Sequence, residues 1–233
     1  MAGFFIAKQV LMKPVILVTF YLNNSFMYDG VFISYRREGS SSFAGVLYDV
    51  LCKNFPSGVV FKDKNKLLPG KDFRDGINHG IDLSHTMLVL IDRNWLNMTD
   101  DKGNKRLWKE DDFIRYEIKT AIEKTRNIIP VLFDGGKMPA ATDLPPDINK
   151  LCDFQAFEID ADNTTESINE LVTIIRSLST QQLGNTLTEA MMKLKKDPKG
   201  TFKNISESFM SLSKREANVI NHYMGKFFKK KKE

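Results

Sequence analysis

Between residues 28 and 180, short apolar runs alternate with polar segments in which apolar residues recur every three or four positions. That recurrence is typical of amphipathic helices, and residues 43–51 and 113–122 show it clearly. The short runs have the length of buried strands and comprise residues 31–33, 59–61, 86–91, 128–132 and 154–159. Asp72 is suited to cap the helix expected after it. Strands alternating with helices predict an α/β domain whose parallel sheet is covered on both faces.

The two ends of the chain differ from this central region. The apolar run at residues 15–22 is shorter than the roughly 20 residues that cross a bilayer, and no signal-peptide cleavage site follows it. We therefore expect residues 1–26 to be an extension of unknown role, with Met27 as an alternative natural start. The domain is expected over residues 27–180, followed by a basic C-terminal segment with short helices over residues 181–233.

The net charge of +5 is concentrated in that C-terminal segment. Residues 185–233 hold 12 Lys and Arg against 5 Asp and Glu, whereas residues 1–184 carry a net charge of −2. A basic tail of this kind can contact nucleic acid or an acidic membrane. A solvated chain end is the commoner explanation of such a run.

Several kinds of chemistry are disfavoured by the residues available. The only cysteines, Cys52 and Cys152, are a hundred positions apart, and the three histidines have no metal-ligand spacing. We therefore expect no disulfide framework, no metal site, and a reducing, cytoplasmic environment. Glycine-rich phosphate-binding loops and a G-x-S-x-G motif are also missing from the sequence.

Five blocks of sequence, taken in order, point to one family. They are residues 29–37 (DGVFISYRR), 60–73 (VFKDKNKLLPGKDF), 81–84 (IDLS), 112–118 (DFIRYEI) and 129–133 (IPVLF). Together they resemble the Toll/interleukin-1 receptor (TIR) domain, and the bacterial NAD-cleaving members in particular. The resemblance implies a flavodoxin-like fold, a five-stranded parallel sheet in the order 2-1-3-4-5 with helices on both faces.

The resemblance also implies an activity, because many TIR domains cleave NAD⁺ at the nicotinamide–ribose bond. Those members carry a glutamate on the helix after the third strand, and Glu117 stands at that position. NAD⁺ would be the substrate, and no separate cofactor is expected. Nicotinamide leaves as a neutral molecule, so the site needs one carboxylate beneath the ribose to stabilise the oxocarbenium-like transition state. The alternative is that Glu117 is a solvated residue beside the apolar stripe of its helix.

Further residues are candidates for binding the substrate. Arg36 and Arg37, after the first strand, could hold the phosphates. Tyr35 could stack on a ring of the substrate, and Phe113 is a further candidate at the position where several active relatives carry tryptophan. The remaining candidates are Asp63, Ser84 and Trp95. For each of these residues a place in the core or in a solvated loop is the alternative.

The sequence therefore predicts a TIR-domain NAD⁺ glycohydrolase that releases nicotinamide and either ADP-ribose or a cyclic ADP-ribose, in bacterial anti-phage defence. Relatives become active when TIR domains associate, so we expect a homo-oligomer with contacts that include the loop from Lys62 to Lys71. A separate sensor or effector protein is a further expected partner. The alternative function is a non-catalytic TIR scaffold or host-mimicking effector that acts through TIR–TIR contacts.

Overall fold

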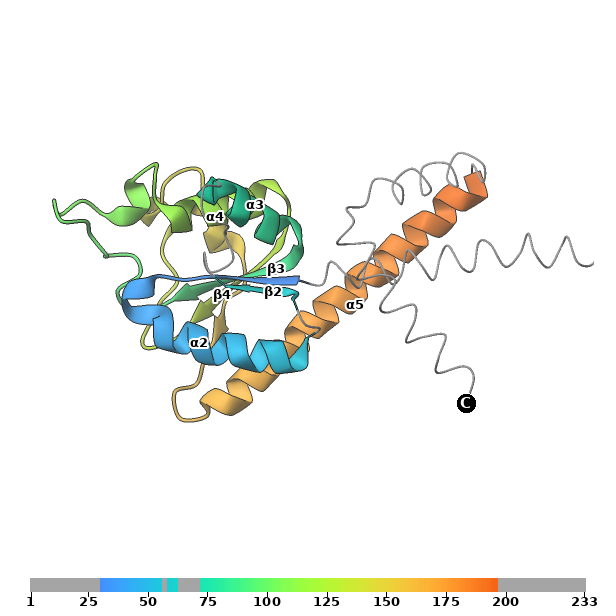
Figure 1. Cartoon of the computed structure of the whole chain (residues 1–233), viewed down its shortest axis with the longest axis horizontal. Helices are drawn as coiled ribbons and strands as arrows, with labels where there is room; N and C mark the ends of the chain where they lie inside the picture. Colours follow the sequence, from blue (N-terminus) through green and yellow to red (C-terminus); the bar gives the residue numbers. More distant parts are fainter. Residues whose placement is uncertain (1–29, 56–57, 63–71, 197–233) are drawn as a thin grey trace, which may run out of the picture. The chain divides into compact units, whose positions relative to one another are not determined.

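A computed structural model describes residues 30–55, 58–62 and 72–196 of the chain. Its centre is a five-stranded sheet in the order β2-β1-β3-β4-β5, with every neighbouring pair parallel (Figure 1). The strands are β1 (Gly30–Ser34), β2 (Val60–Lys62), β3 (Ser84–Ile91), β4 (Asn127–Leu132) and β5 (Phe157–Glu158). This is the flavodoxin-like order that the sequence predicted.

Within the described residues, four α-helices pack on the two faces of the sheet. They are α2 (Arg37–Asn54), α3 (Phe73–Asp82), α4 (Phe113–Glu123) and α5 (Thr164–Lys196). Helices α2 and α5 contribute to the core on one face, and α3 and α4 to the core on the other (Figure 1). Three short 3₁₀ helices lie in the loops, at Arg106–Trp108, Ala141–Asp143 and Asn149–Asp153.

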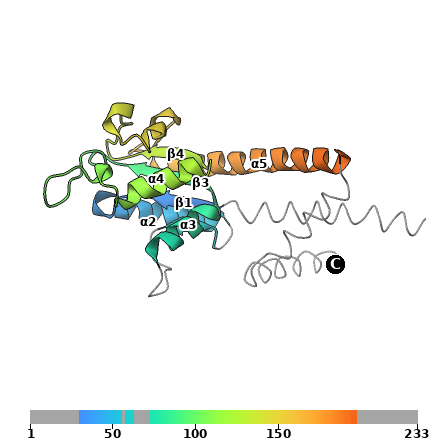
Figure 2. The same cartoon turned by 90° about the horizontal axis from the view of Figure 1, so that it is seen from above.

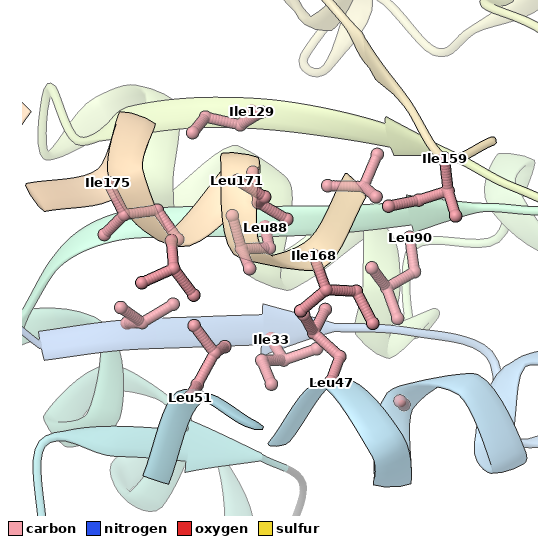
Figure 3. Packing of buried hydrophobic residues seen from close by; sticks show 14 of the residues in the cluster. Ile33, Leu47, Leu51, Leu88, Leu90, Ile129, Ile159, Ile168, Leu171 and Ile175 are labelled. Carbon is pink, nitrogen blue, oxygen red and sulfur yellow. The ribbon is translucent and has the colours of Figure 1, made fainter. Parts of the chain in front are cut away.

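The two cores follow from the alternation of side chains along each strand. In β1, Val31 and Ile33 pack against α2 and α5, whereas Phe32 between them packs against α3. Figure 3 shows the first core, in which residues of α2 and α5 meet residues of β1 and β3; they include Leu47, Leu51, Ile168, Leu171, Ile175, Ile33, Leu88 and Leu90. All eight residues of β3 are buried, as its continuous apolar run predicted.

Aspartates begin the two helices of the second face. The Asp72 carboxylate accepts a hydrogen bond from the backbone N–H of Arg74 at 2.9 Å, which confirms the cap predicted at the start of α3. Asp112 caps α4 in the same way, through the backbone N–H of Arg115 at 3.0 Å. The capping residue of α4 therefore lies five positions before Glu117.

The last helix differs from the prediction. The sequence suggested a final domain helix and then a separate short helix near residues 187–194, but α5 runs from Thr164 to Lys196 without a break. Gly184 costs a helix interior only about 1 kcal/mol relative to alanine, and the first proline after the start of α5 is at position 198. Residues 1–26 and 197–233 lie outside the described part of the chain. Within the described part, every helix is too short or too polar to cross a membrane.

The long loop between β3 and α4 lies at the carboxyl ends of the strands. It runs from Asp92 to Asp112 and is drawn in green, extending on the side of the sheet where α2 begins (Figure 2). In parallel sheets of this kind, ligands bind at the carboxyl ends of the strands. The loops at this edge are therefore the place to look for a functional site.

Candidate active site

The site is built around a contact between the end of β1 and the middle of α4. Ser34, the last residue of β1, donates a hydrogen bond from its hydroxyl to Oε2 of Glu117 at 2.7 Å. Ser34 is fully buried, and Glu117 is 9% exposed. A hydroxyl donor fixes one oxygen of the carboxylate, because a charged acceptor forms a stronger hydrogen bond than a neutral one. The Glu117 carboxylate is thus held at the sheet edge where ligands of this fold bind.

A second contact joins the segment that follows β1 to the residue that caps α4. Arg36 lies two positions after Ser34, and its guanidinium forms a two-pronged ion pair with Asp112, at 2.5 Å from Nη1 to Oδ2 and 3.1 Å from Nη2 to Oδ1. The arginine is 2% exposed and the aspartate is also buried. Asp112 thereby caps α4 and binds Arg36 with the same carboxylate. Its negative charge compensates a cation that would otherwise be costly to bury.

The ion pair continues toward the surface through a second arginine. Arg106, from the 3₁₀ helix of the long loop, places Nε 3.9 Å from Oδ2 of Asp112 and Nη1 2.9 Å from Oε1 of Glu38. The backbone N–H of Glu38 lowers the pKa of its carboxyl, and Arg106 lowers it further. The four charged side chains therefore alternate in sign from the interior to the surface.

A third polar contact shapes the loop after β1. Asp92, directly after β3, accepts hydrogen bonds from the Ser40 hydroxyl at 2.7 Å and from the backbone N–H of Asn94 at 2.8 Å. The chain kinks at Glu38 and at Gly39, whose φ of 121° is a conformation that glycine adopts readily. A side chain at Gly39 would also approach the Asp92 carboxylate at 2.9 Å. The regular part of α2 therefore begins at Ser40, beside Asp92.

The structure brings some of the predicted residues to this edge. Glu117 lies at the end of β1, with Tyr35 and Arg37 in the segment that follows Ser34. Tyr35 is half-buried and packs against the first core, whereas Arg37 is exposed. Phe113 is the first residue of α4, one turn before Glu117, and 38% of it is exposed. Asp63 and most of the loop from Lys62 to Lys71 lie outside the described residues.

Three predicted residues are placed differently. Arg36 was expected to meet phosphates, but both of its terminal nitrogens bind Asp112, and the side chain is buried. Trp95 is 1% exposed and belongs to the second core instead of lining a pocket. Ser84 begins β3 and donates its hydroxyl to the Gly80 carbonyl at 2.7 Å. It therefore lies at the amino end of the strands, on the opposite edge of the sheet from Ser34.

Sequence reasoning assigned no role to Ser34, Asp92, Arg106 or Asp112. Three of these residues stand where a strand or helix meets a polar loop: Ser34, Asp92 and Asp112. That position in the sequence is the feature from which a role in the site could have been predicted. No feature of the sequence distinguishes Arg106, because it lies within a long segment rich in charged residues. Its contacts with Glu38 and Asp112 follow from the path of the long loop.

An open hollow on the long loop is separate from this group. It has a volume of about 470 Å³ and is lined by Asn104, Lys105, Trp108 and Lys109. Lys109 also pairs with Asp100 at 3.3 Å across the turn at the tip of this loop. None of the lining residues comes from the end of a strand or from α4.

The comparisons with known proteins agree with the observed architecture. Residues 31–172 match the family model described as "TIR domain". The chain therefore belongs to the TIR domain family. Among curated proteins it resembles "NAD(+) hydrolase SARM1" of Danio rerio, with 26% identity over 154 residues that make up 65% of this chain. It spans 20% of that relative's length.

Two solved structures also resemble the chain. One is the activated Roq1 resistosome directly recognizing the pathogen effector XopQ, in its TIR domains, with 15% identity and a TM-score of 0.48. That match covers 63% of this chain and 98% of the other. The second is a metazoan TIR-STING receptor from C. gigas, with 21% identity and a TM-score of 0.38. It covers 60% of this chain and 38% of the other.

Proposed function

We propose that this TIR domain is an NAD⁺ glycohydrolase in which Glu117 is the catalytic carboxylate. In the reaction the bond between the ribose C1′ and the pyridinium nitrogen breaks, and its electron pair leaves with neutral nicotinamide. Water then attacks C1′ and loses a proton, giving ADP-ribose. The carboxylate acts by stabilising positive charge on the ribose as the bond breaks.

The observation that carries the proposal is the hydrogen bond from Ser34 to Glu117. It holds an acidic side chain, largely shielded from water, at the sheet edge where ligands of this fold bind. In such surroundings a negative charge interacts more strongly with a developing cation than it does in bulk water. The likeness to a protein named as an NAD(+) hydrolase supports the same chemistry.

The substrate also needs groups for its rings and phosphates. Phe113, exposed one turn before Glu117, offers an aromatic face on the side of α4 where the carboxylate lies. Arg37 is the exposed cation nearest in sequence to the end of β1, which makes it a better phosphate ligand than the buried Arg36. We assign Phe113 to ring contact and Arg37 to phosphate contact in the bound complex.

The test is nicotinamide release from NAD⁺ by the full chain, followed by chromatography over a range of protein concentrations. Glu117→Gln keeps the size of the side chain and removes its charge, so we expect the rate to fall about a hundredfold or more. Glu123→Gln is the matched control, because Glu123 lies on the same helix, is exposed, and pairs only loosely with Lys119 at 3.9 Å. Equal rates for wild type and Glu117→Gln would refute the assignment.

The same experiment addresses the product and the role of assembly. Capture of the ribose cation by water gives linear ADP-ribose, and capture by an adenine nitrogen gives a cyclic product; the two separate on the column. We further propose that association of copies activates the domain, so the rate per molecule should rise with protein concentration. The alternative function, a non-catalytic scaffold, predicts self-association without nicotinamide release. Action in anti-phage defence remains a prediction from the family resemblance.

A further inference from the structure

The two contacts that join β1 and the segment after it to α4 and its capping residue form a closed ring. Ser34 and Arg36 are two positions apart on one side, and Asp112 and Glu117 are five positions apart on the other. Hydrogen bonds close the ring at both ends, from Ser34 to Glu117 and from Arg36 to Asp112. A helix rises about 1.5 Å per residue, so the ring fixes roughly 7.5 Å of α4 against the end of β1.

We propose that the Arg36–Asp112 ion pair positions the catalytic carboxylate, and that Arg36 is a positioning residue instead of a phosphate ligand. By fixing the first turn of α4, the pair sets the distance and direction from which Glu117 meets Ser34. This inference rests on the proposed function, because it concerns the rate that Glu117 supports. In this role the Arg36–Asp112 pair acts by holding Glu117 in position and does not contact the substrate.

The geometry of the pair suits this role. Two parallel hydrogen bonds from a planar guanidinium fix orientation as well as distance, which one contact to an ammonium would not do. The Asp112 carboxylate is shared among Arg36, the backbone N–H of Arg115 and, at 3.9 Å, Arg106. A shift of α4 along its axis would therefore disturb the contacts with both Arg36 and Arg106, whereas the bond to Arg115 moves with the helix. A buried ion pair contributes little net stability compared with apolar residues of similar size, so stability alone does not account for this one.

Arg36 is also poorly placed to bind an anion. Its Nε is buried without a hydrogen-bond partner in the described structure, and both terminal nitrogens bind Asp112. To reach a phosphate, the guanidinium would have to leave Asp112 and expose the capped start of α4. Because only 2% of Arg36 is exposed, it is better placed to hold Asp112 than to bind a ligand.

The test removes the pair without leaving a buried charge. Arg36→Met combined with Asp112→Ser replaces the arginine by an apolar chain and keeps a hydroxyl that can cap α4. We expect kcat for nicotinamide release to fall about tenfold or more, because the carboxylate is misplaced. Asp147→Asn is the matched control, since it removes the negative charge that pairs with Arg115 at 3.0 Å, on the same helix as Glu117 but outside the ring.

A second measurement needs no catalysis. Ser34→Ala should lower Tm in the wild-type background and by about half as much or less in the Arg36→Met, Asp112→Ser background, because the Ser34–Glu117 contact is then already displaced. Equal Tm shifts in the two backgrounds, or a folded double variant with wild-type kcat, would overturn the inference. If wild type releases no nicotinamide, the proposed function fails, while the Tm comparison still decides whether the pair positions Glu117. If the double variant does not fold, Arg36→Lys, which keeps the charge but loses the two-pronged contact, serves for both measurements.

Discussion

The Ser34 hydroxyl and the Glu117 carboxylate are 2.7 Å apart in space and 83 positions apart in the chain. The sequence around each residue does not predict the contact, because Ser34 ends a strand and Glu117 lies in the middle of a helix. The contact exists because the sheet order places α4 across the carboxyl end of β1. A buried acid is thereby fixed at the edge of the sheet where this fold binds ligands.

Removal of the Ser34 hydroxyl should affect both stability and activity. Ser34→Ala leaves a buried carboxylate oxygen without this donor, which should cost about 1–3 kcal/mol of unfolding free energy. The same loss of orientation should reduce nicotinamide release about tenfold. Ser41→Ala is the control, because its exposed hydroxyl donates to the Arg37 carbonyl within α2 and lies outside the contact between Ser34 and Glu117. Urea unfolding and NAD⁺ turnover, measured on both variants, check the two effects; unchanged turnover in Ser34→Ala would count against an orienting role.

The Glu38 carboxyl, which is held by its own backbone N–H and by Arg106, should make stability depend on pH in acid. The pKa of Glu38 is lowered in the folded state from its ordinary value of 4.5, so the charged form favours folding. Its contribution is therefore complete above pH 4.5 and is lost as the pH falls through the lowered folded value. Wild type should have a higher Tm than Glu38→Gln at pH 7, and the difference should vanish in strong acid.

The effect at Glu38 should be small, because 61% of its side chain is exposed and water screens the pair. Glu123→Gln provides a comparison at a similarly exposed position. A Tm difference between wild type and Glu38→Gln that stayed constant from pH 7 into acid would show that the charge at Glu38 is not its cause.

The two cysteines should react at different rates with a thiol reagent. Cys152 is half-buried and donates its Sγ–H to the Pro139 carbonyl at 3.1 Å, and burial raises the pKa of its thiol, with Asp153 and Asp143 adding to the shift. Cys52 is exposed on α2. Because the thiolate is the reactive form, iodoacetamide should modify Cys52 several times faster. Peptide mapping by mass spectrometry measures the order, and Cys52→Ser should remove the fast phase.

Two glycines should respond to alanine in opposite directions. A Cβ at Gly30 would lie 2.2 Å from the Leu83 carbonyl oxygen, at the point where the pairing of β1 with β3 shifts register. Gly30→Ala should therefore destabilise the domain by about 1–3 kcal/mol. At Gly45, inside α2, the nearest atom is Lys62 Nζ at 4.0 Å, so alanine should stabilise by about 0.5–1 kcal/mol. Urea unfolding of both variants tests the contrast, and equal shifts would contradict it.

Most of the fold could be predicted from the sequence, because local pattern controls it. The alternation of apolar runs with amphipathic segments located the strands, and the family resemblance supplied their order, which the sheet confirms. The continuous run of β3 indicated a strand buried on both faces, which it is. The length of α5 could not be predicted, because a glycine within a polar helix gives a weak signal for its end.

The candidate site was harder to predict, since it depends on pairs that only the packed structure brings together. Two adjacent arginines in a polar loop suggest two exposed cations, yet Arg36 is buried because Asp112, 76 positions away, neutralises it. Ser84 and Ser34 look alike in sequence, each standing at one end of a strand. Only the direction of the strands shows that they lie on opposite edges of the sheet.

The long sequence separations within the ring also determine when it can form during folding. The Ser34–Glu117 and Arg36–Asp112 contacts close loops of nearly the same length, spanning 83 and 76 positions. The entropy cost of closure grows only slowly with length, and a second contact inside a loop that is already closed adds little to it. The two contacts should therefore form together, after β1 and α4 have met. A nascent chain that has left the ribosome only as far as the middle of β3 contains Ser34 and Arg36 but lacks both acidic partners, so this arrangement cannot arise before α4 has been synthesised.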